Sequence, residues 1–222
     1  MDNKGQQVIN SPHPIHALSE IISPLRMGTY LQASGHNPDR ALALYLWNAK
    51  MGEAFHLPIQ SFEVGLRNRV SDGISAVFGA EWWQDQGFLD EAGDKRQRDL
   101  NLVLRRLNSK GIAPDTGQLV AGLSFGFWIA MLHGRHNIRI WSSELKSAFP
   151  HLPEEITRKR LHSRATKIAD FRNRISHHEP IFKRNLASDY GMCMEAMKWL
   201  CPTKAAWIKP HCRVSAMIRE KP

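Results

Sequence analysis

A short stretch in the C-terminal third of the chain, residues 169–180, is rich in side chains suited to phosphoryl chemistry. A guanidinium holds a phosphate through paired hydrogen bonds, and a histidine transfers protons near neutral pH. A structural helix end needs about one such polar group, so the density suggests more than a cap. The stretch contains Arg172, Asn173, Arg174, His177, His178 and Glu179.

Helical spacing places one arginine of this stretch on an apolar face. The apolar stripe consists of Leu161, Ala165, Ile168 and Ile175. At about 100° per residue, Arg172 falls inside that stripe. A guanidinium on a core face is costly unless an anion or acceptor meets it. Arg172 therefore predicts either an internal ion pair with Glu63 or a phosphate site.

Asn173 and His177 lie four residues apart and share a different face of the helix. Asn173 can orient the imidazole of His177, and the helix dipole favours a protonated imidazole in the last turn. His177 can therefore act as a general acid or base. It lies about 140° from Arg172 on an unbroken helix, so the two groups meet on one phosphate only if the helix end unwinds or a second copy contributes. This mismatch favours a dimeric site.

A metal site at His177, His178 and Glu179 is the alternative reading of the same stretch. Adjacent histidines point in different directions on a helix, and no His-x-x-x-His or paired-cysteine pattern completes a ligand set. We therefore expect no metal and no cofactor. The three cysteines, Cys193, Cys201 and Cys212, are odd in number and loosely spaced, which argues against a disulfide framework.

Three segments in a fixed order resemble a known family. They are residues 61–69 (SFEVGLRNR), residues 123–128 (LSFGFW) and residues 171–182, which contain the Arg172-Asn173-x-x-x-His177 motif. Together they cover roughly residues 40–200, and the chain resembles the Abi-like, abortive-infection branch of the HEPN superfamily. The resemblance implies an all-helical homodimer that cuts RNA without metal, as a toxin or phage-defence effector.

The resemblance also implies roles for individual residues. Arg172 would hold the scissile phosphate, His177 would move a proton at the ribose 2′-hydroxyl or the leaving oxygen, and Asn173 would position them. His178 is the alternative motif histidine. Some members only bind nucleic acid, so a non-catalytic RNA- or partner-binding module is the rival hypothesis. An antitoxin, protein or RNA, is left open as a further partner.

Basic residues on the predicted motif helix favour RNA as the partner. The formal net charge is +9, which indicates a polyanionic ligand. Within the resembling segment 61–69, Glu63 and Arg67 are expected to form a supporting face, with Glu63 pairing Arg67 or Arg172. The residues expected to contact the RNA backbone are Arg158, Lys159, Arg164, Lys167 and Arg174.

Apolar periodicity without strand alternation predicts an all-α fold, a HEPN-like helical bundle with additional helices. We expect a flexible tail over residues 1–14 and a single helical domain over residues 15–220. Pro24 is expected to interrupt a helix, and Pro58 is expected to break or kink the chain. The predicted helices span residues 15–27, 37–55, 59–78, 94–109, 116–132, 141–149, 153–178, 187–200 and 204–219.

The composition favours a soluble cytoplasmic protein. The polar N-terminal residues lack the apolar core of a signal peptide. The longest apolar segment, residues 119–129, is shorter than the roughly 20 residues needed to cross a bilayer. We therefore expect a buried helix there and no membrane partner.

Overall fold

The computed structural model describes residues 13–222, apart from the side chain of Ile138, and this part of the chain is all-α without a strand. The expected tail over residues 1–14 lies outside the described residues up to residue 12, and Pro14 already begins a helix. The α-helices are α1 Pro14–Ile22, α2 Pro24–Ala33, α3 Pro38–Phe78, α4 Gln86–Asn108, α5 Thr116–Gly122, α6 Phe125–Met131, α7 Ser142–Ala148, α8 Arg158–Ser176, α9 Leu186–Leu200, α10 Pro202–Ile208 and α11 Val214–Arg219.

Helix α3 is the axis on which the other helices pack, and its 41 residues span about 60 Å. Of the break or kink expected at Pro58, the break is wrong, because the helix continues through this residue. A proline inside a helix costs about 3 kcal/mol, since it removes one hydrogen bond and crowds a carbonyl. Phe55 and Ile59 are buried on either side of Pro58, and burial of a helical face outweighs one unfavourable residue.

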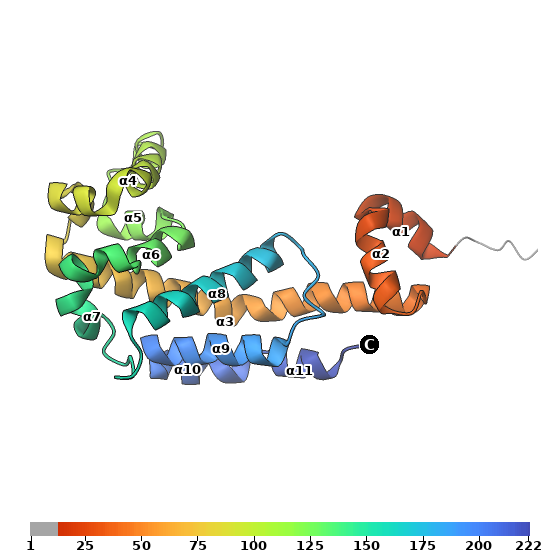
Figure 1. Cartoon of the computed structure of the whole chain (residues 1–222). Helices are drawn as coiled ribbons and strands as arrows, with labels where there is room; N and C mark the ends of the chain where they lie inside the picture. The colour runs from red at the N-terminus through yellow and green to blue at the C-terminus, as the bar shows by residue number, and fades with distance from the viewer. Residues whose placement is uncertain (1–12) are drawn as a thin grey trace, which may run out of the picture.

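Helices α8 and α9 lie along α3 and close the core on one side (Figure 1). The rings of Phe55 on α3 and Phe171 on α8 meet edge to face, with centroids 4.7 Å apart. Helix α8 is held to the core through Leu161, Ala165, Ile168 and Phe171. Helix α8 crosses α3 obliquely (Figure 1), and its C-terminal part still contacts the core through the buried Phe171 and the partly buried Ile175.

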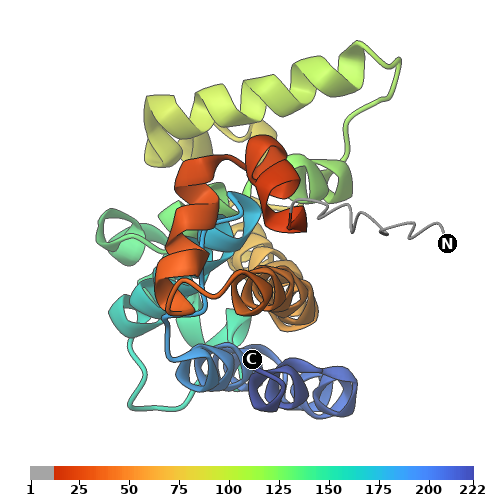
Figure 2. The same cartoon turned by 90° about the vertical axis from the view of Figure 1, so that its right-hand side faces the viewer.

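Helices α10 and α11 pack against α9, and α11 also contacts α3, while the other helices form two groups at opposite ends of α3 (Figures 1 and 2). Helices α1 and α2 fold back at its N-terminal end, and Pro24 separates them as expected, with Ser23 at a positive φ of 85°. Helices α4 to α7 gather at its C-terminal end. Between residues 13 and 222, no helix is long and apolar enough to cross a membrane.

Four of the expected helices have boundaries in the structure that differ from the expected ones. The apolar segment 116–132 forms α5 and α6, since Leu123 is extended and the Ser124 side chain accepts the Phe127 N–H at 3.2 Å. The motif helix begins at Arg158 rather than 153, after the N-cap Thr157. Pro210 lies in a turn that separates α10 from α11. Helix α4 begins at Gln86 and has non-helical backbone at Gly93 (φ 73°, ψ 167°), so the helical part after Gly93 begins close to the expected Asp94.

Candidate active site

A groove opens between the middle of α3 and the C-terminal half of α8. The two helices run antiparallel (Figure 1) and come close where Gly52 meets Ile175. A Cβ on Gly52 would lie 3.2 Å from Ile175 Cγ2, so only glycine gives this approach without displacement. Next to this contact lies a hollow of about 430 Å³, whose polar lining consists of His56, Gln60, Glu63, Arg67, Arg172 and Ser176.

Arg172 points into this hollow and not into the core. Its side chain is 44% exposed, so the expectation of a core-facing arginine is wrong. Its neighbours on α8 stay in contact with the core, since Phe171 is buried and Ile175 packs partly buried against it, so Arg172 lies beside the buried face and at the edge of the hollow. Arg172 Nε lies 3.8 Å from Glu63 Oε2, and its Nη1 donates to Asn173 Oδ1 at 3.4 Å.

The two residues expected to support the arginine, Glu63 and Arg67, line the same hollow. Glu63 pairs with Arg172, and among the described residues no ion pair joins it to Arg67. Arg67 Nε is buried and has no hydrogen-bond partner in the part of the chain that the structure describes. A buried N–H without a partner costs about 1–3 kcal/mol, so it marks a place where a bound acceptor would be stabilising.

His56 is a site residue that the sequence reasoning missed. It lies one turn after Gly52 on α3, and Arg172 lies one turn before Ile175 on α8. The antiparallel register therefore sets His56 across the hollow from Arg172. A signal was present, because Gly52, His56, Gln60 and Glu63 follow each other at spacings of three and four on one face of a long helix.

The motif end of α8 forms a tight turn. The helix ends at Ser176, His178 N–H donates to Ile175 O at 2.9 Å, and Glu179 N–H donates to Arg174 O at 2.9 Å. This is a Schellman motif, with His178 at the left-handed position that glycine favours; its φ is 55°. The expected stop near His178 is close to the observed end, since Pro180 follows.

A second hollow, of about 860 Å³, continues the groove past the motif turn. It shares Gly52, His56 and Ser176 with the first and adds His178 and Glu179. Arg26 on α2 borders it and donates to His178 O at 2.9 Å, which fixes the turn. Of the two motif histidines, His178 therefore lines the groove.

His177 and Asn173 are not joined as expected. His177 is exposed and lines neither hollow. Among the described residues no side-chain hydrogen bond links it to Asn173, whose Oδ1 accepts from Arg172 instead. Within one copy of the chain, the groove thus brings together Arg172, Glu63 and His56, while His177 lies outside it.

The residues expected to bind RNA differ in exposure and in whether their charged groups already have a partner within the chain. Lys159 and Lys167 are exposed. Arg158 donates to Leu132 O and, at 3.1 Å, to Asn137 Oδ1. Two other arginines have carboxylate partners: Arg164 pairs with Glu195, and Arg174 pairs with Glu179 at 3.1 Å.

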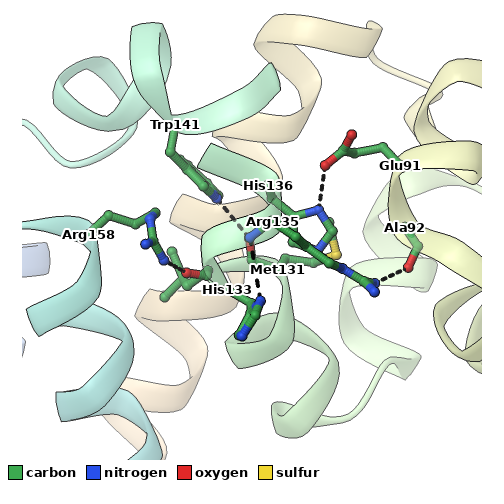
Figure 3. A network of polar contacts seen from close by, with 9 residues as sticks. Glu91, Ala92, Met131, His133, Arg135, His136, Trp141 and Arg158 are labelled. Atoms are coloured by element: carbon green, nitrogen blue, oxygen red, sulfur yellow. Dashed lines mark hydrogen bonds and ion pairs between the residues drawn. The ribbon is translucent and has the colours of Figure 1, made fainter. Parts of the chain in front are cut away.

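A closed polar network surrounds the turn between α6 and α7 (Figure 3). His136 is fully buried, and its Nδ1 lies 2.7 Å from Glu91 Oε1. Arg135 Nε donates to His136 Nε2 at 3.0 Å, so that nitrogen carries no proton and Nδ1 donates to Glu91. Burial is the main cause that lowers the pKa of His136 from its ordinary value, and the nearby Arg135 lowers it further.

Within residues 13–222, no three His, Cys, Asp or Glu side chains lie close enough together to hold a metal ion. The metal-site alternative at His177, His178 and Glu179 therefore lacks a ligand cluster in this part of the chain. The three cysteines are free thiols, and burial raises the pKa of Cys193 to about 12.

Comparisons with protein-family models, with curated proteins and with solved structures give no match for this chain.

Proposed function

We propose that this chain is a metal-independent endoribonuclease whose active site is the groove between α3 and α8. The observation that carries the proposal is the convergence of Arg67, Arg172, Glu63 and His56 on one hollow. The net charge of +9 and the resemblance of three segments to Abi-like HEPN proteins support it. By that resemblance, the protein acts in the cytoplasm as a toxin or phage-defence effector.

RNA carries its own nucleophile, so cleavage needs no metal. A general base removes the proton of a ribose 2′-hydroxyl, and the oxygen attacks the adjacent phosphorus. The bond to the 5′ oxygen of the next nucleotide breaks, and a general acid protonates that oxygen. The products are a 2′,3′-cyclic phosphate and a 5′-hydroxyl. Negative charge grows on the phosphate oxygens, where Arg172 and Arg67 would stabilise it.

Two sources of proton transfer fit this groove. His56 lies across from Arg172 in the same copy of the chain, and His178 borders the continuation of the groove. His177 would act only if a homodimer brings it from a second copy, as the family resemblance implies. The first arrangement needs one chain, whereas the second needs two, so activity against protein concentration distinguishes them.

The test is cleavage of a defined single-stranded RNA in the presence of EDTA. We expect products with 2′,3′-cyclic phosphate ends, and no cleavage when the ribose at the cut site is 2′-deoxy. Arg172→Ala and His56→Ala should each lose at least about 100-fold in rate. Arg160→Ala and His151→Ala are the matched controls, since both residues are exposed and lie outside the groove. Intact RNA at high concentrations of folded protein would reject the proposal.

A non-catalytic RNA-binding module is the second candidate. It is favoured by the exposed position of His177 outside both hollows. It predicts binding of uncleaved RNA that weakens steeply with salt and is unchanged in His177→Ala. Cleavage that requires added metal would support the metal-dependent alternative instead.

The proposed role in defence is tested in cells. Induced expression of the wild-type chain should arrest growth, and the Arg172→Ala/His177→Ala double variant should not. Rescue by a co-expressed neighbouring gene product or RNA would identify an antitoxin. Equal growth of both strains, at matched expression, contradicts a toxin role without bearing on cleavage in vitro.

A further inference from the structure

A third hollow, lined by positive charge, lies away from the groove, where the start of α3 meets the connection from α8 to α9 and residues 221–222. Its volume is about 470 Å³, within the range of small-ligand pockets. Among the described residues, no Asp or Glu side chain lines it. The cationic lining consists of Arg40, Lys183, Arg184 and Lys221.

Most of this positive charge is not neutralised by the protein. Arg184 makes two hydrogen bonds of 2.8 Å to Asp189, which compensate its charge and raise its pKa. Within residues 13–222, Arg40, Lys183 and Lys221 form no ion pair with a carboxylate. Three like charges around one hollow repel each other, so an anion placed among them lowers the free energy.

Hydrogen-bond donors also remain free. Lys221 Nζ donates to Phe182 O at 2.9 Å, which leaves two of the three ammonium protons. Arg184 uses Nε and one Nη2 proton on Asp189 and keeps its remaining guanidinium protons. No side-chain hydrogen bond of Arg40 or Lys183 occurs among the described residues. The hollow therefore offers several cationic N–H donors, and none of the described side chains that line it is acidic.

The backbone that carries two of these cations is fixed in place. Ile181 N–H donates to the buried Asn48 side chain at 2.7 Å. Ile181 and Phe182 are themselves buried, and the Phe182 carbonyl is held by Lys221. Lys183 directly follows these anchors. A site built on fixed backbone loses less entropy on binding than a mobile loop does.

We propose that this pocket, lined by Arg40, Lys183, Arg184 and Lys221, binds the phosphate group of a phosphorylated ligand. Guanidinium and ammonium groups are the side chains that recognise phosphate in proteins. The phosphate comes from one of two sources, a free mononucleotide or the 5′ end of an RNA strand. The proposal goes beyond RNA cleavage and does not depend on it.

The test is a titration of the ¹⁵N-labelled full chain by NMR at constant ionic strength. The probes are inorganic phosphate, adenosine 5′-monophosphate, and 2′-O-methyl hexaribonucleotides with and without a 5′-phosphate. We expect the amides of Lys183 and Arg184 to shift with every phosphate-ended probe. If the mononucleotide binds most tightly, the natural ligand is a free nucleotide. If the 5′-phosphorylated hexamer binds more tightly than the hydroxyl-ended hexamer, the natural ligand is the 5′ end of an RNA strand.

Two double variants complete the test. Arg40→Gln/Lys183→Gln should weaken binding of the preferred probe about tenfold or more. Arg160→Gln/Lys146→Gln removes the same two charges at the other end of α3 and should leave the affinity unchanged (Figure 1). The proposal is overturned if Lys183 and Arg184 shift with none of the probes, or if both variants bind as the wild-type chain does. Neither result depends on RNA cleavage, which is measured separately.

Discussion

Arginines at the two ends of α8 differ in what their N–H groups contact. At the N-terminal end, Arg158 donates to Leu132 O and Asn137 Oδ1, and a neighbouring arginine, Arg135, donates to Ala92 O and His136 (Figure 3). At the C-terminal end, Arg172 lies 3.8 Å from Glu63 and 3.4 Å from Asn173. The Nε of Arg67, across the groove, is buried with no partner in the described part of the chain.

This difference separates structural from functional positive charge. A carbonyl that accepts from an arginine is satisfied, so the N-terminal network stabilises the turn between α6 and α7 and has little left to offer a ligand. An unsatisfied buried donor lowers stability, and a catalytic role or a bound ion is one recognised reason for a protein to keep one. The residue type alone does not distinguish the two ends, because both carry arginines on one helix.

The largest expected effect is on catalysis, from Arg172→Ala. Removing one donor to developing charge typically costs 100- to 1000-fold in rate, about 2.7–4 kcal/mol. Because the side chain is 44% exposed, the free energy of unfolding should change by less than about 0.5 kcal/mol. Single-turnover cleavage and urea unfolding measure the two quantities. A large loss of stability would mean that Arg172 has a structural role like that of Arg158 and Arg135, and the two ends of α8 would not differ in function.

A loss of stability is expected from Gly73→Ala, because Gly73 packs against Trp141 beside the polar network at the turn between α6 and α7. Alanine normally stabilises a helix relative to glycine. Here the added Cβ would lie 2.6 Å from Trp141, which cannot move away because its Nε1 donates to Met131 O at 2.7 Å. Overpacking of this kind costs about 1–3 kcal/mol. Urea unfolding measures it, and Gly28→Ala is the control, since nothing lies within 4 Å of a Cβ there. An equal gain in both variants would show that Trp141 is not fixed.

The network should also make the fold sensitive to acid. Burial lowers the folded-state pKa of His136 and of His162 below the ordinary 6.5. The unfolded chain therefore binds more protons as the pH falls through 6.5. The stability contributed by these two groups is complete above that pH and is lost below it.

Thermal unfolding between pH 7.5 and 5 measures this loss. His136 faces Glu91, Arg135 and His133, and His162 faces His133 and Arg158, so the change should appear at the α6–α7 end of the molecule. His162→Gln should flatten the pH dependence, whereas His151→Gln, at an exposed position, should not. A stability that stays constant down to pH 5 would contradict the assignment.

Apolar periodicity predicted the all-α class and the central positions of most helices, but it predicted their ends less well. The expectation that a proline ends a helix failed at Pro58, because the residues buried on both sides of it keep α3 continuous. The expectation of one helix over residues 116–132 also failed, at Leu123 and Ser124, where one side-chain cap divides an apolar segment in two. Spacing shows which residues share a face. It does not show the tertiary contacts that decide whether a weak point becomes a break.

The site was predictable in part for the same reason. Arg172, Glu63 and Arg67 were singled out, and the structure brings all three to one hollow. The sequence could not show that a hollow opens beside the contact between α8 and α3, so the expectation placed Arg172 in the core and missed His56. The sequence also could not show that the Arg158 guanidinium donates to Leu132 O and Asn137 Oδ1. Both errors concern contacts between segments far apart in the chain.

The smallest expected effect comes from the motif turn, at His178→Gly. His178 has a φ of 55° at the C-terminal turn of α8, a conformation that costs a residue with a Cβ about 1–2 kcal/mol. Glycine removes that cost but loses more conformational entropy on folding, so we expect a net gain of about 0.5–1 kcal/mol in urea unfolding. His36, with a φ of 60° and outside the groove, is the matched control, and His36→Gly should give a similar gain. If the histidine is retained at a strained position for catalysis, cleavage should fall in His178→Gly and not in His36→Gly. An equal rate in both variants would leave His56 as the groove histidine that catalysis requires.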